Sequence, residues 1–127
     1  MIDRNESPEA LAQVANVPIE LSRLVFAAAG CSEGVALLRS PGRGEILVGQ
    51  RHAVAWAARD YLGATYEQIG RAINRDHSVV VRGYNVARRM RKTDPEFREL
   101  SNALARTVAG RTVARTAHRR PRREAAA

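Results

Sequence analysis

The stretch "RAINRDHSVVVRGYN", residues 71–85, decides how this chain folds. Its three consecutive valines favour a β-strand, because β-branched residues are common in strands. Arg82 and Gly83 interrupt that run, however, and no other segment carries the signal of a partner strand. At helical spacing the same residues separate onto two sides. We therefore predict a helix that starts at Asp76 and runs to about Arg91.

The two sides of this predicted helix differ in character. The apolar side, which we expect to be buried, contains Val79, Val80, Gly83, Val86, Ala87 and Met90, with Tyr84 near its edge. The polar side contains Ser78, Arg82, Asn85 and Arg89. A solvated surface is the usual explanation of such a polar side. Here seven basic residues and one acid lie between Arg71 and Lys92, and this charge favours contact with a polyanion.

A shorter helix is predicted in the segment "TYEQIGRAIN", just before the turn. Thr65 and the glutamine three residues later have the spacing of a capping box. Gly70 lowers helix propensity, which indicates that another helix approaches closely there. Asn74 tolerates the left-handed conformation of a tight turn, and Asp76 is a good N-cap for the second helix. Two helices joined in this way form a helix-turn-helix.

The polar side of the second helix carries side chains that suit DNA. His77 and Ser78 occupy the first turn, where recognition helices usually touch bases. Arg82 matches N7 and O6 of guanine, and Asn85 matches adenine. Arg89 lies further along the same face, and the N-terminus of the helix itself favours a phosphate.

The rest of the chain also reads as helical. Further helices are predicted in "SPEALAQVAN" after Ser7, in "PIELSRLVFAAAG" up to Gly30, from near Ser32, in "QRHAVAWAARDYL" up to Gly63, and from Pro95 after Asp94. Tyr61 and Leu100 are expected on the buried sides of their helices. Four Gly and Pro residues predict a loop over residues 40–49 that carries Arg43. The expected fold is an all-α helix-turn-helix bundle of about five to six helices.

Charge and composition suggest three parts in the 127-residue chain. Residues 1–18 form an N-terminal extension, residues 19–108 the DNA-binding domain, and residues 109–127 a disordered basic tail. Residues 39–108 hold 13 basic against 7 acidic groups, and residues 1–38 hold 2 against 5. The net charge of +8 therefore lies in the C-terminal two-thirds. Of the 21 basic residues 20 are Arg, which suits bidentate contact with phosphate and guanine, although a GC-rich genome also favours Arg.

Several classes of function fit the sequence poorly. No apolar run is long enough for a membrane span, and the acidic start is not a secretory signal, so we expect a cytoplasmic, nucleoid-associated protein. A Ser78–His77 pair would be adjacent on one helix, without a third group to orient it, so we expect no enzyme. His52, His77 and His118 are far apart and Cys31 is the one cysteine, so no metal, cofactor or small-molecule substrate is expected. His52 is expected at a solvated or phosphate-facing helix start.

Three segments resemble a known family. These are "RHAVAWAARDYL" (residues 51–62), "YEQIGRAINRDHSVVVRGYNVARRM" (66–90) and "DPEF" (94–97). They resemble the C-terminal DNA-binding domain, domain IV, of the bacterial replication initiator DnaA. The family pattern is an Arg-Gln-x-Ala helix, then Glu-Ile-Gly, a short turn and Arg-Asp-His-Thr-Thr-Val. The resemblance covers roughly residues 19–107.

The resemblance implies roles for individual residues. His77 and Ser78 would read bases in the major groove, and Arg43, eight residues before Arg51, would enter the minor groove. Asp76 would cap the helix and contact a base. Arg51, Arg75 and Arg82 would lie near phosphates or bases.

The chain departs from the family at places that bear on function. Val79 replaces a threonine, Asn74 stands where the family often has two glycines, and the basic loop is thinner. The preferred site is therefore expected to differ from a DnaA box. The sequence has no GxxxxGK[ST] loop, so the resemblance implies a DNA reader without the initiator's ATPase.

Three functions remain open at this point. The first is a sequence-specific double-stranded DNA-binding transcription regulator, in the manner of phage-derived or gene transfer agent activators. The second is a replication-linked protein that occupies DnaA-type sites. The third is a helical adaptor whose acidic N-terminal region, residues 1–38, contacts RNA polymerase or another co-activator protein.

Overall fold

The computed structural model describes residues 7–109, which form seven α-helices and one π-helical turn with no strand among them. This confirms the all-α prediction, with slightly more helices than expected. The helices are α1 (Pro8–Ala15), α2 (Ile19–Ala29), α3 (Ser32–Leu38), α4 (Glu45–Ala57), α5 (Tyr66–Ile73), α6 (His77–Thr93) and α7 (Pro95–Val108), and the π-helical turn η1 spans Ala58–Leu62. The predicted disordered tail, apart from Ala109, lies outside the described residues.

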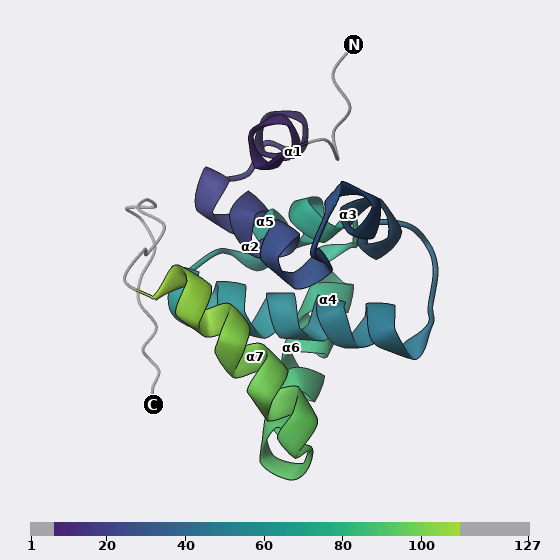
Figure 1. Cartoon of the computed structure of the whole chain (residues 1–127), viewed down its shortest axis with the longest axis vertical. Coiled ribbons are helices and arrows are strands. Elements are labelled where there is room, and N and C mark those ends of the chain that lie inside the picture. The colour runs from purple at the N-terminus through teal and green to yellow at the C-terminus, as the bar shows by residue number, and fades with distance from the viewer. Residues whose placement is uncertain (1–6, 110–127) are drawn as a thin grey trace.

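Helix α4 lies at the centre of the bundle (Figure 1). It packs against α2, α5, α6 and α7, and in this view α5 lies behind α2 while the first part of α6 lies behind α4. Its inner positions hold small side chains, and Ala53, Val54 and Ala57 have no exposed surface. Small side chains let helices approach closely, so a chain poor in aromatic residues still forms a dense core.

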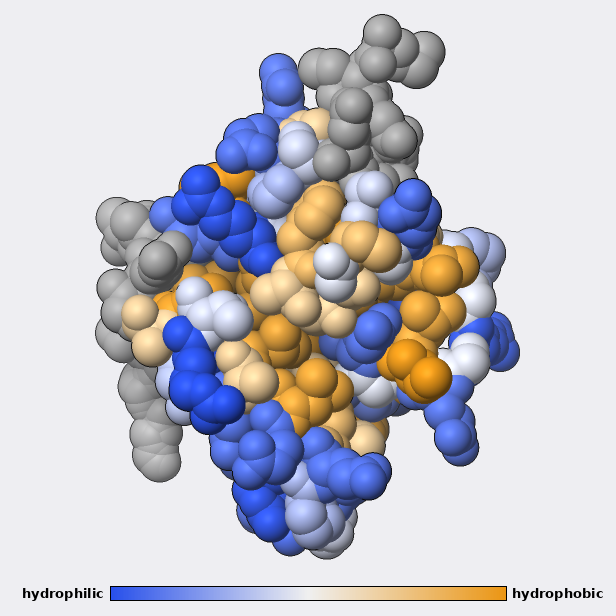
Figure 2. All heavy atoms as spheres, viewed as in Figure 1, coloured by the Kyte–Doolittle hydropathy of each residue, from blue (hydrophilic) through white to orange (hydrophobic). Residues whose placement is uncertain are grey.

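The surface around this core is uneven in polarity. In the view of Figure 2, apolar residues gather in the middle of the face, over α2 and α4, and hydrophilic residues cover the lower end where α6 passes into α7. Within residues 7–109 no single helix is long and apolar enough to cross a membrane. The pair α2 and α3 reaches that length only together, and the two helices meet at 97°.

The predicted helix ends are confirmed at seven positions, while the start of α4 differs. Ser7, Thr65, Asp76 and Asp94 each accept a hydrogen bond from a backbone N–H in the first turn of the helix that follows. Thr65 and Gln68 form the complete capping box. Gly30, Gly63 and Asn74 end their helices at positive φ, which Gly and Asn tolerate best.

One predicted helix boundary is wrong. Helix α4 begins at Glu45, so the predicted loop over residues 40–49 shrinks to the segment before Glu45, and Gly49 lies inside the helix. Gly44 stands at the N-cap and Glu45 in the first turn, where an acidic side chain favours a helix. Helix α1, within the predicted N-terminal extension, packs on the bundle: Leu11 is fully buried and the Ser22 hydroxyl donates to the Pro8 carbonyl at 2.6 Å.

Three residues expected in the core are exposed. Val79 is 38% exposed, Leu100 39% and Tyr61 42%. Val79 lies in the first turn of α6, where the helix borders a cleft. Tyr61 belongs to η1, whose wider turn changes the register of the helical stripe, and its ring meets Trp56 edge-on at 5.3 Å. Leu100 lies beside the buried face of α7, which runs instead through Phe97, Ser101, Leu104, Ala105 and Val108.

The two helical glycines Gly70 and Gly49 give a matched test of packing. A Cβ at Gly70 would overlap the Arg75 carbonyl oxygen, whereas a Cβ at Gly49 would meet nothing within 4 Å. Gly70→Ala is therefore expected to lower the free energy of unfolding by about 1–3 kcal/mol. Gly49→Ala is expected to leave it unchanged or raise it by up to about 1 kcal/mol. Urea unfolding followed by circular dichroism measures both, and equal effects would contradict the described packing.

Candidate nucleic-acid interface

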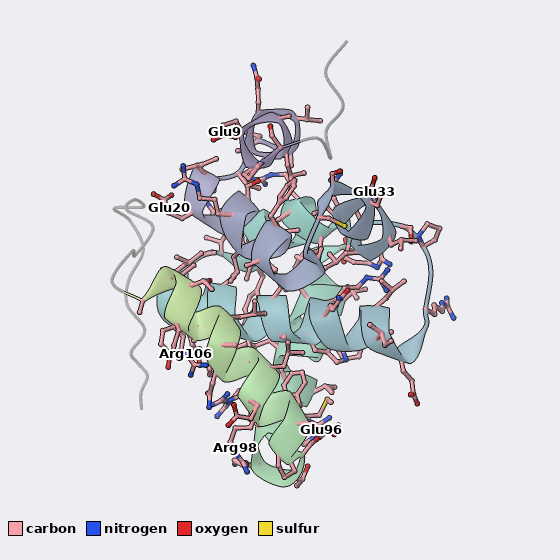
Figure 3. All side chains as sticks on the ribbon, in the orientation of Figure 1. Glu9, Glu20, Glu33, Glu96, Arg98 and Arg106 are labelled. Atoms are coloured by element: carbon pink, nitrogen blue, oxygen red, sulfur yellow. The ribbon has the colours of Figure 1, made fainter. Side chains whose placement is uncertain are left out.

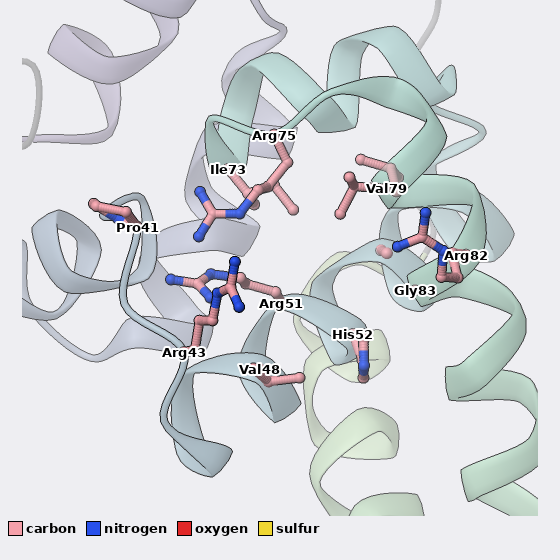
Figure 4. Close-up of a pocket in the computed structure, with 12 residues that line it drawn as sticks. Pro41, Arg43, Val48, Arg51, His52, Ile73, Arg75, Val79, Arg82 and Gly83 are labelled. Carbon is pink, nitrogen blue, oxygen red and sulfur yellow. The ribbon is translucent and has the colours of Figure 1, made fainter.

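A cleft of about 700 Å³ opens between the loop before α4, the exposed side of α4 and the first turns of α6 (Figure 4). Its lining includes four arginines and one histidine, namely Arg43, Arg51, Arg75, Arg82 and His52, and no carboxylate. The guanidinium groups of Arg43, Arg51 and Arg75 converge on one side, and Arg82 and His52 lie on the other. Such a concave surface with one sign of charge attracts anions.

The helix-turn-helix forms one wall of this cleft. The turn between α5 and α6 is short, with Asn74 at φ 60° and ψ 50° and with the Arg75 N–H donating to the Gly70 carbonyl at 2.8 Å. Gly70 leaves room for this turn because any side chain would meet the Arg75 carbonyl. The close approach predicted at Gly70 is therefore made by the turn of its own motif and not by another helix.

Arg51 is buried, with 7% of its surface exposed, and it holds the loop that carries Arg43. It donates to the carbonyls of Leu38 at 2.7 Å, Gly42 at 2.7 Å and Ser40 at 2.9 Å. Burial first, and the nearby Arg75 guanidinium second, lower the pKa of Arg51. The sequence placed Arg51 near a phosphate or base, but its donors are already bound to backbone carbonyls. We therefore assign it the role of positioning the loop.

Two further arginines tie the helix-turn-helix to the same loop. Arg75 donates to the Ser40 carbonyl at 2.6 Å, so that carbonyl accepts from both Arg75 and Arg51. The buried Arg39 donates to the Ala72 carbonyl at 2.9 Å. Asn74 returns a hydrogen bond to the Arg39 carbonyl at 3.2 Å. These contacts fix the Arg43 loop and α6 relative to each other.

The polar face of α6 is exposed as predicted. His77, Ser78, Arg82, Asn85 and Arg89 all lie at the surface, as does the capping Asp76. The Asp76 carboxylate accepts from the Ser78 hydroxyl at 2.5 Å and from its N–H at 3.0 Å, and these two bonds lower the pKa of Asp76. Ser78 is therefore held in place by the helix cap, while the hydroxyl oxygen keeps acceptor capacity.

The positive charge of this surface is not neutralised from within. In the described part of the chain the one ion pair joins His77 Nδ1 to Asp76, 3.9 Å apart. Over the same residues, the side chains of Arg43, Arg82 and Asn85 form no hydrogen bond with the protein. Their donors are available to a ligand.

His52 belongs to the cleft although the sequence did not single it out as a site residue. Because α4 begins at Glu45, His52 lies well inside the helix and is half-buried, not at a helix start. A Cβ at Gly83 would come within 2.9 Å of His52 Nδ1, so the absence of a side chain at Gly83 allows α6 to pack closely against α4. Burial, and then the charge of Arg51, lower the pKa of His52.

The chain shares part of its sequence with a curated protein. It is 37% identical over 68 residues to the chromosomal replication initiator protein DnaA of Oleidesulfovibrio alaskensis. The match covers 53% of this chain and 15% of that protein, so the chain spans a small part of the relative's length. No protein-family model matches the chain, and no solved structure matches it significantly. The similarity is consistent with a DnaA-like helical domain.

Arg51 and Arg43 give a matched pair of neighbouring arginines for mutation. Arg51→Ala removes the side-chain donor from the carbonyls of Leu38 and Gly42, so we expect the free energy of unfolding to fall by about 1–3 kcal/mol. Arg43→Ala removes an exposed charge and is expected to change it by less than about 0.5 kcal/mol. Denaturant unfolding of both variants measures the difference. A tolerated Arg51→Ala would show that the loop is held by other contacts.

Proposed function

We propose that this chain is a sequence-specific double-stranded DNA-binding protein that acts as a transcription regulator, most simply an activator. The observation that carries this proposal is the cleft with four arginines and no carboxylate, directly beside the exposed polar face of α6. Such a surface suits a polyanion that also exposes base edges to side chains. Duplex DNA has both the negative charge and the base edges.

The shape of the site suggests how the duplex would lie. Helix α6 would enter the major groove with its first turns, where His77, Ser78 and Arg82 are exposed. Arg43, on the opposite side of the cleft, would reach the adjacent minor groove. The sugar-phosphate backbone between the two grooves would then occupy the cleft. The arginine contacts to the loop support this arrangement because they fix the spacing of the two reading elements.

Val79 gives the reading face an apolar element. It is exposed beside Ser78 and Arg82 and lines the cleft. An exposed aliphatic side chain at this place suits the methyl group of thymine, which no hydrogen-bonding residue recognises in the same way. This supports a site preference unlike that of a reader with threonine at the same position.

The alternatives make separate predictions. A replication-linked protein would bind at the DNA sites that the initiator DnaA occupies. Part of this chain is similar in sequence to that initiator. An adaptor would use the acidic residues of α1–α3, which include Glu9, Glu20 and Glu33 (Figure 3). A catalytic role is disfavoured because the Ser78 hydroxyl donates to Asp76 and not to an imidazole base. A promoter-reporter assay and mapping of binding sites across a genome distinguish regulation from replication.

A selection from random duplex oligonucleotides tests the proposal directly. The wild-type protein is expected to enrich one motif. His77→Ala and Arg82→Ala are expected to weaken binding to it by about 1–3 kcal/mol each, roughly fivefold to a hundredfold, and to relax its preference. Arg106→Ala, which removes an exposed arginine of α7 that does not line the cleft, is the charge-matched control (Figure 3). If no motif emerges and the cleft variants bind like the control, specific reading is ruled out.

A further inference from the structure

His52 is the one titratable side chain in the cleft lining whose charge can change near neutral pH, because the other four charged side chains are arginines. It projects from α4 beneath Gly83 of α6 (Figure 4). Its two ring nitrogens form no hydrogen bond within residues 7–109. The ring therefore lies against the wall of an anion-binding cleft without a partner that fixes its protonation.

The charged side chains that line the cleft with His52 are all positive. Arg51 precedes it on α4, Arg82 lines the cleft from α6, and Arg43 and Arg75 line it from the loop and from the turn before α6. No carboxylate lines the cleft. Burial and the Arg51 charge hold the pKa of His52 below its usual value, so the imidazole is neutral in the free protein at neutral pH.

We propose that His52 is a phosphate-binding residue of this cleft and that it takes up a proton when a DNA backbone phosphate enters. The proposal rests on the proposed function and deepens it, because it assigns the step that couples duplex binding to pH. A phosphate brings negative charge next to the ring, and this favours the imidazolium that the free cleft disfavours. The protonated ring also gains a second N–H donor, which a phosphate oxygen can accept.

The direction of the pH effect follows from the two protonation states. The pKa of His52 is lower in the free protein than in the complex, so the complex holds more protons between the two values. Affinity is therefore highest where both states are protonated. Affinity falls as the pH rises through the pKa of His52 in the free protein and then through its pKa in the complex. It levels off above both values. The effect is bounded at roughly tenfold in affinity for each unit by which binding raises the pKa.

The test measures the dissociation constant of the selected duplex between about pH 5.5 and about pH 8, at constant ionic strength. Wild-type affinity is expected to fall about threefold to tenfold over this range. His52→Gln, whose side chain is polar but does not titrate, is expected to lose most of this dependence. His77→Gln removes the other described histidine of the binding surface and is expected to retain it.

Two further measurements do not depend on the fold of a variant. Calorimetry of the wild-type complex in buffers of different ionisation enthalpy reports proton uptake, and NMR titration of the His52 ring reports its pKa with and without duplex. Uptake of a proton together with a raised His52 pKa supports the proposal. A pH-independent affinity, a dependence unchanged in His52→Gln, or one lost only in His77→Gln overturns it while DNA binding stands. Failure to bind any duplex at any pH overturns both this inference and the proposed function.

Discussion

The buried guanidinium of Arg51 donates to backbone carbonyls and not to a carboxylate. The shape and the positive charge of the cleft both depend on these hydrogen bonds. A buried charge requires hydrogen bonds to nearly all of its donors. Arg51 finds them at the end of α3 and in the loop that follows, at Leu38, Ser40 and Gly42. Carbonyl dipoles satisfy the donors but leave the net charge in place. The cleft therefore keeps its positive potential while its walls are held rigidly.

Two glycines allow α6, which forms the other wall of the cleft, to take its position. Gly83 lets α6 lie close against His52 of α4, and Gly70 lets the turn before α6 fold back over the end of α5. The neighbouring positions of α4 are mostly alanine and valine. A larger side chain at either glycine would push α6 away from α4 and change the distance between the Arg43 loop and the polar face of α6. The packing of α6 and the width of the cleft are thus set by the same few contacts.

The sequence predicts those features that depend on neighbours along the chain. The capping residues Thr65, Asp76 and Asp94 act on N–H groups two or three residues away, and all three were predictable. The polar face of α6 was predictable for the same reason, because helical periodicity fixes which residues share a side. The exposure of Val79 was not predictable. Helical periodicity places Val79 on the apolar side, and only the arrangement of the loop and α4 leaves that position uncovered.

The hydrogen bonds of Arg51 could not be predicted from neighbouring residues along the chain. Its partners lie 9 to 14 residues earlier, in a segment whose path depends on the fold of the whole domain. The predicted helix over residues 50–62 already places Arg51 on the same side as Val54, Ala55 and Ala58, all buried. An arginine on the buried side of a helix needs carbonyls or carboxylates close by. That pattern was the signal in the sequence for a structural role of Arg51.

The charges that line the cleft repel one another in the free protein. Guanidinium groups that converge without carboxylates reduce the stability of the free fold. Burial, and then the charge of Arg51, lower the pKa of His52 and so favour its neutral ring. An anion in the cleft removes the repulsion, so its binding energy and the stability of the fold are thermodynamically linked. A surface that only had to be soluble would gain stability from a single carboxylate at this place, and the cleft lining contains none.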